Sequence, residues 1–238
     1  MATVNHVPRV PDKVSLRRVM GRVVFDLLYP PRCGSCDRRD TLFCEQCRAQ
    51  LLPADRGPHG VRGVRALICA GVFSGPLRAA IHNFKYASDR RLSGPMAGLI
   101  YQALKASTAW NNLSVTTPLL VPVPLHPAKE KARGYNQSLL LASDLAAMTG
   151  WTLDSRLDRI RETASQVGLD LQGRRKNVRD AFEWRGENAP ERVVLIDDVC
   201  TTGATLSECA MALAGAGAKQ IYVGTVARAA GLQRDVGA

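Results

Sequence analysis

The chain has 238 residues, of which 46% are hydrophobic, and a formal net charge of +11. This length is enough for one α/β domain of ordinary size with a small additional module. The longest apolar runs, such as 66–73 and 119–123, are too short to cross a bilayer, and residues 1–10 lack the apolar segment of a signal peptide. We therefore expect a cytoplasmic protein that does not insert into a membrane.

The excess of positive charge indicates an anionic partner, either a phosphorylated small molecule or a nucleic acid. Arg supplies 25 of the 32 basic residues, and a genome rich in Arg codons would give the same total. The net charge alone therefore leaves contact with nucleic acid open. In a reducing compartment, the seven Cys are expected to be metal ligands or buried thiols rather than disulfides.

The start of the chain predicts a loose tail and then an amphipathic helix. Residues 1–13 show no apolar periodicity, whereas residues 15–28 place apolar side chains on one helical face and Arg residues off it. Pro30 and Pro31 end this helix. A basic amphipathic helix can lie on a membrane surface, but docking on its own domain is the simpler interpretation.

Two Cys-x-x-Cys pairs follow, Cys33 with Cys36 and Cys44 with Cys47. Each pair presents two thiolates from one tight turn, so that the two pairs can close a tetrahedral metal site. Structural zinc is the preferred ion, because it binds thiolates without redox chemistry and stabilises segments that are poor in hydrophobic residues. An iron–sulfur cluster and a metal-free dithiol are the alternatives.

Residues 53–65 are rich in Pro and Gly, which is typical of a linker. The linker divides the chain into an N-terminal part, residues 1–60, and a larger domain, residues 61–238. The N-terminal part holds the amphipathic helix and a small four-cysteine module that is similar to a zinc ribbon. The larger domain alternates predicted strands and helices, which is typical of an α/β fold.

The larger domain begins with a predicted strand at 66–73, a helix that opens at Gly75 and a second helix at about 92–106. Lys85 and Tyr86 lie where the first helix ends. They are positioned to reach a phosphate from the flank of the domain. A solvated Lys at a helix end is an equally good interpretation of Lys85.

Residues 119–126 predict a further strand, which Pro122 and Pro124 restrict to a sheet edge or a strand end. We interpret His126 as a turn residue. A basic loop follows, and then a helix runs from Ser138 to about Met148.

The basic loop contains Arg133, Gly134 and Tyr135. A strand, a basic glycine-containing loop and a helix together predict an anion site at the carboxyl end of the strand. The alternative for Arg133 is an ordinary surface charge.

The segments 153–159 and 181–184 predict short strands on either side of a long polar and basic segment, 162–179. Long loops in compact domains are commonly functional or disordered. A lid that closes over a polyanion would need such basic residues and would exclude water.

Residues 193–205 carry the strongest functional signal. The apolar run Val193–Ile196 predicts a buried central strand, because a strand covered on both faces needs no polar alternation. Asp197 and Asp198 follow it. Two carboxylates at a strand end are costly to desolvate, and we expect them to hold a polar ligand.

A hydroxyl-rich turn follows the acids and leads into a predicted helix that reaches Leu213. Backbone N–H groups and hydroxyls at such a helix start form an anion site of the size of a phosphate. The turn residues are Thr201, Thr202, Gly203, Ala204 and Thr205. A ribose 5-phosphate fits this arrangement, because the two carboxylates can accept hydrogen bonds from its vicinal hydroxyls and the turn can bind its phosphate. The alternative interpretation is a plain strand–loop–helix with a capping Thr. A last strand is predicted at 221–226.

This stretch resembles the signature with which type I phosphoribosyltransferases bind 5-phosphoribosyl-1-pyrophosphate (PRPP). The resemblance implies that Asp197 and Asp198 hold the ribose hydroxyls and that 201–205 hold the 5′-phosphate. Cys200 departs from the usual pattern, in which an aliphatic residue is common. Residues 133–135 look like the pyrophosphate loop of the adenine-type members.

In their order along residues 20–230, the paired cysteines, the basic loop and the PRPP signature resemble the ComF family. This resemblance implies a type I phosphoribosyltransferase-like fold with a doubly wound, mostly parallel sheet and an N-terminal zinc-finger-like module. It also implies a cytoplasmic protein associated with natural competence and DNA uptake.

Two functions are compatible with this resemblance. As an enzyme, the protein would transfer phosphoribosyl from PRPP to an unidentified nitrogen acceptor, with Mg²⁺ and Arg133 neutralising the pyrophosphate and the two Asp positioning the ribose. As a non-catalytic competence factor, it would sense a nucleotide or bind single-stranded DNA, with the zinc module docking DNA-uptake proteins. No general base stands out, and an oligomer is left open.

Overall fold

The computed structural model describes residues 30–54, 60–87, 89–161 and 180–230. The helix predicted at 15–28 and the lid predicted at 162–179 lie outside the described residues. Within the described ranges, no helix is both long and apolar enough to span a bilayer.

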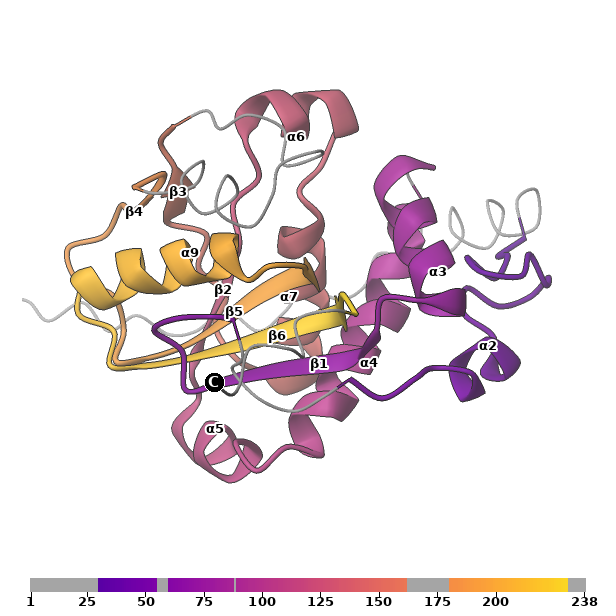
Figure 1. Cartoon of the computed structure of the whole chain (residues 1–238), viewed down its shortest axis with the longest axis horizontal. Coiled ribbons are helices and arrows are strands. Elements are labelled where there is room, and N and C mark those ends of the chain that lie inside the picture. The colour runs from indigo at the N-terminus through magenta and orange to yellow at the C-terminus, as the bar shows by residue number, and fades with distance from the viewer. Residues whose placement is uncertain (1–29, 55–59, 88, 162–179, 231–238) are drawn as a thin grey trace, which may run out of the picture.

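Helices and strands alternate along the chain (Figure 1). In chain order they are α2 (Glu45–Ala49), β1 (Ala66–Val72), α3 (Gly75–Tyr86), the 3-10 turn η1 (Arg90–Leu92), α4 (Ser93–Lys105), α5 (Trp110–Thr116), β2 (Leu119–Pro122), α6 (Pro127–Arg133), α7 (Gln137–Thr149), β3 (Leu157–Arg159), β4 (Phe182–Trp184), β5 (Arg192–Cys200), α9 (Ala204–Gly215) and β6 (Gln220–Arg228).

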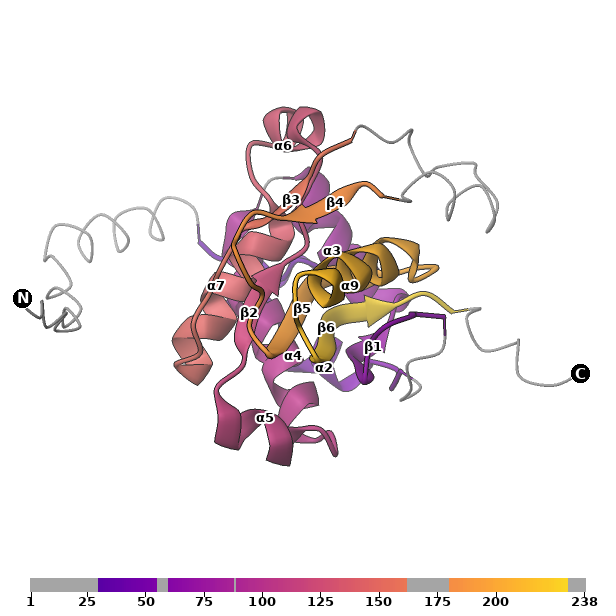
Figure 2. The same cartoon turned by 90° about the vertical axis from the view of Figure 1, so that its left-hand side faces the viewer.

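Four parallel strands form the central sheet, in the order β1, β6, β5, β2. Val194 and Ile196 of β5 pack into one core with α4 and α7, whereas Val193 and Leu195 pack into a second core with α9 (Figure 2). Both faces of β5 are therefore buried, which explains its uninterrupted apolar run. The predicted α/β class and the doubly wound, mostly parallel sheet are confirmed.

The central strand is longer than the apolar run predicts. Pairing with β6 continues as far as Cys200, which lies opposite Arg228. Asp197 and Asp198 therefore lie in the carboxyl-terminal half of β5, in agreement with their predicted place at the carboxyl end of the strand, and the strand continues for two residues beyond them. β2 is an edge strand that ends at Pro122, as the prolines predict.

Part of the predicted basic loop is helical. Pro127 occupies the first turn of α6, and Gly134 ends the helix with a φ of 80°. Nδ1 of His126 accepts a hydrogen bond from the Ala128 N–H at 3.2 Å, so His126 caps the start of the helix, whereas the sequence predicts a turn residue. The loop that carries Arg133 is thus built on a short, well-capped helix.

Helix α5 is not predicted by the sequence. Trp110 is its first residue. The centroid of the Trp110 ring lies 5.9 Å from the centroid of the Tyr101 ring and 5.9 Å from that of the Trp151 ring. These aromatic contacts come from distant parts of the chain, and a local pattern does not reveal them. The predicted strands at 153–159 and 181–184 shorten to β3 and β4, which pair antiparallel with each other outside the main sheet.

The four-cysteine segment packs against α3, η1 and α4. Phe43, which is 7% exposed, shares a core with Leu77 and Leu92. The carbonyl oxygen of Gly34 accepts a hydrogen bond from Nδ2 of Asn83 at 2.9 Å. The module therefore supports the helix that leads to Lys85.

Candidate functional site

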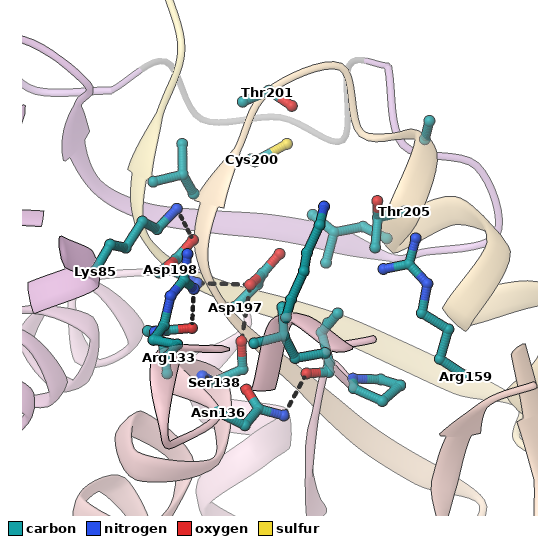
Figure 3. A pocket seen from close by; sticks show the side chains of 18 of the residues that line it. Lys85, Arg133, Asn136, Ser138, Arg159, Asp197, Asp198, Cys200, Thr201 and Thr205 are labelled. Atoms are coloured by element: carbon teal, nitrogen blue, oxygen red, sulfur yellow. Dashed lines mark hydrogen bonds and ion pairs between the residues drawn. The ribbon is translucent and has the colours of Figure 1, made fainter. Parts of the chain in front are cut away.

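The strand order creates a natural ligand site. β2 and β5 are neighbours, and the helices α7 and α9 that come after them cover opposite faces of the sheet. In open α/β sheets such a change of face leaves a crevice at the carboxyl ends of the strands, where ligands bind. A cavity of about 310 Å³ lies there and brings together the two predicted anion sites (Figure 3).

The two carboxylates of β5 meet partners from different elements. Oδ1 of Asp197 accepts hydrogen bonds from Ser138 Oγ at 2.9 Å and from the Asp198 N–H at 2.8 Å. Oδ1 of Asp198 lies 2.9 Å from Nζ of Lys85, whose side chain is 22% exposed. Lys85 is therefore an ion-pair partner inside the cavity, which decides against a solvated helix end.

Burial and charge shift the pKa values of this group. Burial, followed by the adjacent Asp198 carboxylate, raises the pKa of Asp197 to about 7. Burial alone would lower the pKa of Lys85, but the charge of Asp198 and its hydrogen bond outweigh burial and raise it. The cavity thus holds a proton on Asp197 over a wider pH range than an exposed Asp would.

This raised pKa predicts a pH-dependent stability. As pH rises from about 4 toward about 7, unfolded chains release the Asp197 proton before folded ones do, so the free energy of unfolding falls. Asp197→Asn keeps the shape but removes this titration. We expect urea unfolding to show the variant gaining stability relative to the wild type at pH 8 compared with pH 5. An equal difference at both pH values would contradict the raised pKa.

The basic loop is fixed on the end of α3. The Arg133 guanidinium lies 5.5 Å from the ring centroid of Tyr86 and donates to Oε1 of Gln137. The Tyr135 hydroxyl donates to the Phe84 carbonyl oxygen. The loop and the last turn of α3 therefore form one supported wall of the cavity.

Not every residue of the predicted anion loop faces the cavity. Arg133 lines it, whereas Gly134 and Tyr135 do not. Gly134 ends α6 and its carbonyl oxygen accepts from Arg90 Nη2 at 2.7 Å, while Tyr135 is 6% exposed. These two residues shape the loop, and Arg133 is the one that presents a charge.

The turn after β5 is tightly packed. Gly203 has a φ of 74°, and a Cβ on it would lie 2.6 Å from the Gly60 carbonyl oxygen, so a side chain would be strained there. Thr202 does not line the cavity, and its Oγ1 accepts from the Ala204 N–H at 3.3 Å. Thr201 and Thr205 do line it, together with Gly203 and Ala204 at the start of α9.

The four predicted metal ligands also come together. The Sγ atoms of Cys33, Cys36, Cys44 and Cys47 all lie within 4.8 Å of one another, and those of Cys36 and Cys44 are 3.6 Å apart. Tetrahedral coordination with Zn–S bonds of about 2.3 Å requires sulfurs about 3.8 Å apart. The cluster therefore has the donor set and the approximate spacing of a tetrathiolate metal site.

The electrostatic environment of the cluster differs between its thiols. Burial raises the pKa of Cys33, but the N–H groups of Cys44, Cys36 and Ser35 outweigh it and lower the pKa to about 6. Burial raises the pKa of Cys47 to about 12. N–H groups directed at sulfur favour the thiolate form that a metal ion requires.

Comparison with known proteins identifies the family. No family model matches the chain. Competence protein F of Haemophilus influenzae is 30% identical over 206 residues, which cover 84% of this chain and 85% of that protein. The chain belongs to the ComF family. DNA utilization protein YhgH of Salmonella typhimurium is 29% identical over 199 residues, 83% of each chain, and Competence protein ComFC of Streptococcus pneumoniae is 27% identical over 205 residues, 86% of this chain and 84% of that protein.

Among solved structures, that of TT1426 from Thermus thermophilus aligns with 63% of this chain and 86% of that chain. The sequence identity is 16% and the TM-score is 0.33.

The cavity of this ComF protein contains charged residues that sequence reasoning missed. Lys129 of α6 and Arg159 of β3 join Lys85 and Arg133, so that four cationic side chains line the cavity together with two carboxylates. Burial, and then the charges of Arg159, Arg133 and Lys85, lower the pKa of Lys129. Lys129 lies in the predicted basic loop, so a signal existed for it; Arg159 reaches the cavity only through tertiary folding.

Proposed function

We propose that this ComF protein binds PRPP in the cavity at the carboxyl ends of β2 and β5. The observation that carries the proposal is that one cavity joins a carboxylate pair, a helix start after β5 and a cationic loop after β2. PRPP needs these three features together: acceptors for two ribose hydroxyls, a 5′-phosphate site and a cationic site for the diphosphate.

The residues divide among these parts of the ligand. Asp197 and Asp198 would accept hydrogen bonds from the ribose hydroxyls, and Arg133 with Lys129 would hold the diphosphate. Thr201, Thr205 and the N-terminal end of α9 would hold the 5′-phosphate. Thr202, Gly134 and Tyr135 would keep the two loops in shape.

The reaction that this arrangement supports is transfer of phosphoribosyl to a nitrogen acceptor. The bond from the anomeric carbon to the diphosphate oxygen breaks, and its electron pair leaves with pyrophosphate. The nitrogen lone pair forms the new C–N bond, and the nitrogen then loses a proton to water. Arg133 would stabilise the leaving charge, and the carboxylates would stabilise a cationic ribose ring. Mg²⁺ bound to the PRPP oxygens would neutralise further charge.

Binding of single-stranded DNA is a second candidate function. The names of the relatives refer to competence and DNA utilization, and the net charge of +11 favours an anionic polymer. A panel of nucleobases tested for turnover with PRPP, beside a salt titration of DNA binding, separates the two. Counterion release predicts a steep loss of affinity with salt for DNA binding.

We also infer that the four-cysteine cluster binds one zinc ion. Cys33, Cys36, Cys44 and Cys47 would hold it, and it would supply structural cross-linking of the module. Four protein ligands leave no open position for a substrate.

Ligand binding is expected to raise the melting temperature. A ligand that binds only the folded state stabilises it by about 2.7 kcal/mol at a hundredfold excess over its dissociation constant. For a domain of this size each kcal/mol raises Tm by about 2–4 °C, so Mg²⁺ with PRPP should raise it by about 5–11 °C. A thermal-shift titration measures this directly. An unchanged Tm at millimolar PRPP would remove the proposed function.

A further inference from the structure

Lys85 occupies the carboxylate that a ribose would need. Its Nζ lies 2.9 Å from Oδ1 of Asp198, and only 9% of the Asp198 side chain is exposed. The ammonium group therefore uses acceptor capacity that a ribose hydroxyl would otherwise take. A diol that binds Asp198 must compete with Lys85.

The backbone that carries Lys85 is fixed, whereas its side chain has rotatable bonds of its own. Phe84 is fully buried and its carbonyl oxygen accepts from the Tyr135 hydroxyl. Asn83 is tied to Gly34 by its hydrogen bond of 2.9 Å. The four-carbon stem of Lys85 can nevertheless change rotamer without moving α3, because Lys carries a point charge on a flexible chain.

The displaced Lys85 ammonium gains a new partner only from a ligand that carries an anion near Arg133. Moving a half-buried ammonium off its carboxylate is costly unless another anion replaces the carboxylate. Arg133 enters the cavity close to Lys85 and Asp198 (Figure 3), so an anion held by Arg133 lies on the side to which Lys85 can turn. A diphosphate at the anomeric carbon supplies this anion, whereas a ribose 5-phosphate has none there.

We propose that Lys85 is a specificity-determining residue, a displaceable counter-ion of Asp198 that makes the site select ligands with both a ribose diol and a diphosphate. This inference rests on the proposed PRPP function. Before a ligand binds, Lys85 holds Asp198 and so weakens binding of a sugar phosphate alone. With PRPP, Lys85 turns to the diphosphate and releases the carboxylate for the ribose.

The test compares two ligands in two variants by calorimetry, PRPP with Mg²⁺ and ribose 5-phosphate. Lys85→Met keeps the apolar stem and removes the charge. Lys105→Met is the matched control, since Lys105 also lies in the last turn of a helix but rests on the Tyr101 ring, 5.4 Å from its centroid, outside the cavity. Both variants are compared with the wild type at one ionic strength.

Lys85→Met is expected to weaken PRPP binding at least about tenfold, the lower end for loss of a hydrogen bond to a charged group. Ribose 5-phosphate should bind equally well or more tightly, because its competitor at Asp198 is gone. The selectivity, the ratio of the two dissociation constants, should therefore fall at least about tenfold, and Lys105→Met should leave it unchanged.

Equal weakening of both ligands, or no change in either, would overturn the inference while leaving PRPP binding by the wild type intact. Failure of the wild type to bind PRPP would instead remove the proposed function and this inference with it. If Lys85→Met does not fold, Lys85→Gln keeps a donor for Asp198 without the charge. PRPP binding should then still weaken about tenfold, because the diphosphate loses its ammonium partner, while ribose 5-phosphate should bind as it does to the wild type.

Discussion

Replacing both carboxylates, Asp197→Asn with Asp198→Asn, is expected to weaken PRPP binding at least about a hundredfold. Hydrogen bonds to charged groups contribute roughly 1.5–3 kcal/mol each, and at pH 8, above the Asp197 pKa of about 7, the double change removes both charges from the ribose site. Binding of inorganic phosphate should persist or become tighter, because the turn after β5 is unchanged and two negative charges are gone from its neighbourhood. Calorimetry measures the affinity of the variant for each of the two ligands, PRPP and inorganic phosphate.

The double variant is expected to keep its fold. Asn at 198 still offers an oxygen to Lys85, and Asn at 197 still accepts from Ser138, so neither partner is left without an acceptor. Removing the charge of Asp197 also removes its cost of burial. Asp144→Asn, within α7 and outside the cavity, is the control for a change of charge alone. Unchanged affinity for both ligands would show that the carboxylates do not face a ribose.

How much of the site could be predicted depends on how local its parts are. The carboxylates and the turn at 201–205 are contiguous in sequence, so residue types and spacing predict them together. The partners of the carboxylates are not contiguous. Lys85 reaches Asp198 from α3, and Ser138 reaches Asp197 from the start of α7. No local pattern pairs these residues, because the pairing follows from the order of strands in the sheet.

The fold shows the same division. Apolar runs predict the four sheet strands because both faces of the sheet are buried. The end of β5 depends on how far β6 continues beside it, and a single strand does not reveal this. Helix α6 is predictable from the sequence, since Pro127 and Gly134 are ordinary signals for the start and the end of a helix.

Loss of the proposed zinc ion is expected to have the second large effect, a fall in the stability of the folded protein. Structural zinc sites can contribute on the order of 10 kcal/mol of binding energy, which becomes folding energy when the site exists only in the folded state. Cys33→Ser with Cys47→Ser leaves two ligands. The zinc content, measured by metal analysis, should therefore fall from about one ion per chain to none. Cys69→Ser makes the same chemical change outside the cluster and should keep the metal.

The effect should extend beyond the four-cysteine module, because the module packs on α3. Phe43 shares a core with Leu77 and Leu92, and Gly34 accepts from Asn83, two residues before Lys85. Without metal, the last turn of α3 loses this support, so both the melting temperature and the affinity for PRPP should fall, whereas Cys69→Ser should retain its affinity. A double variant that retains one zinc per chain would contradict the assignment of the ligands. A metal-free variant with unchanged PRPP affinity would show that the module does not support the cavity through α3.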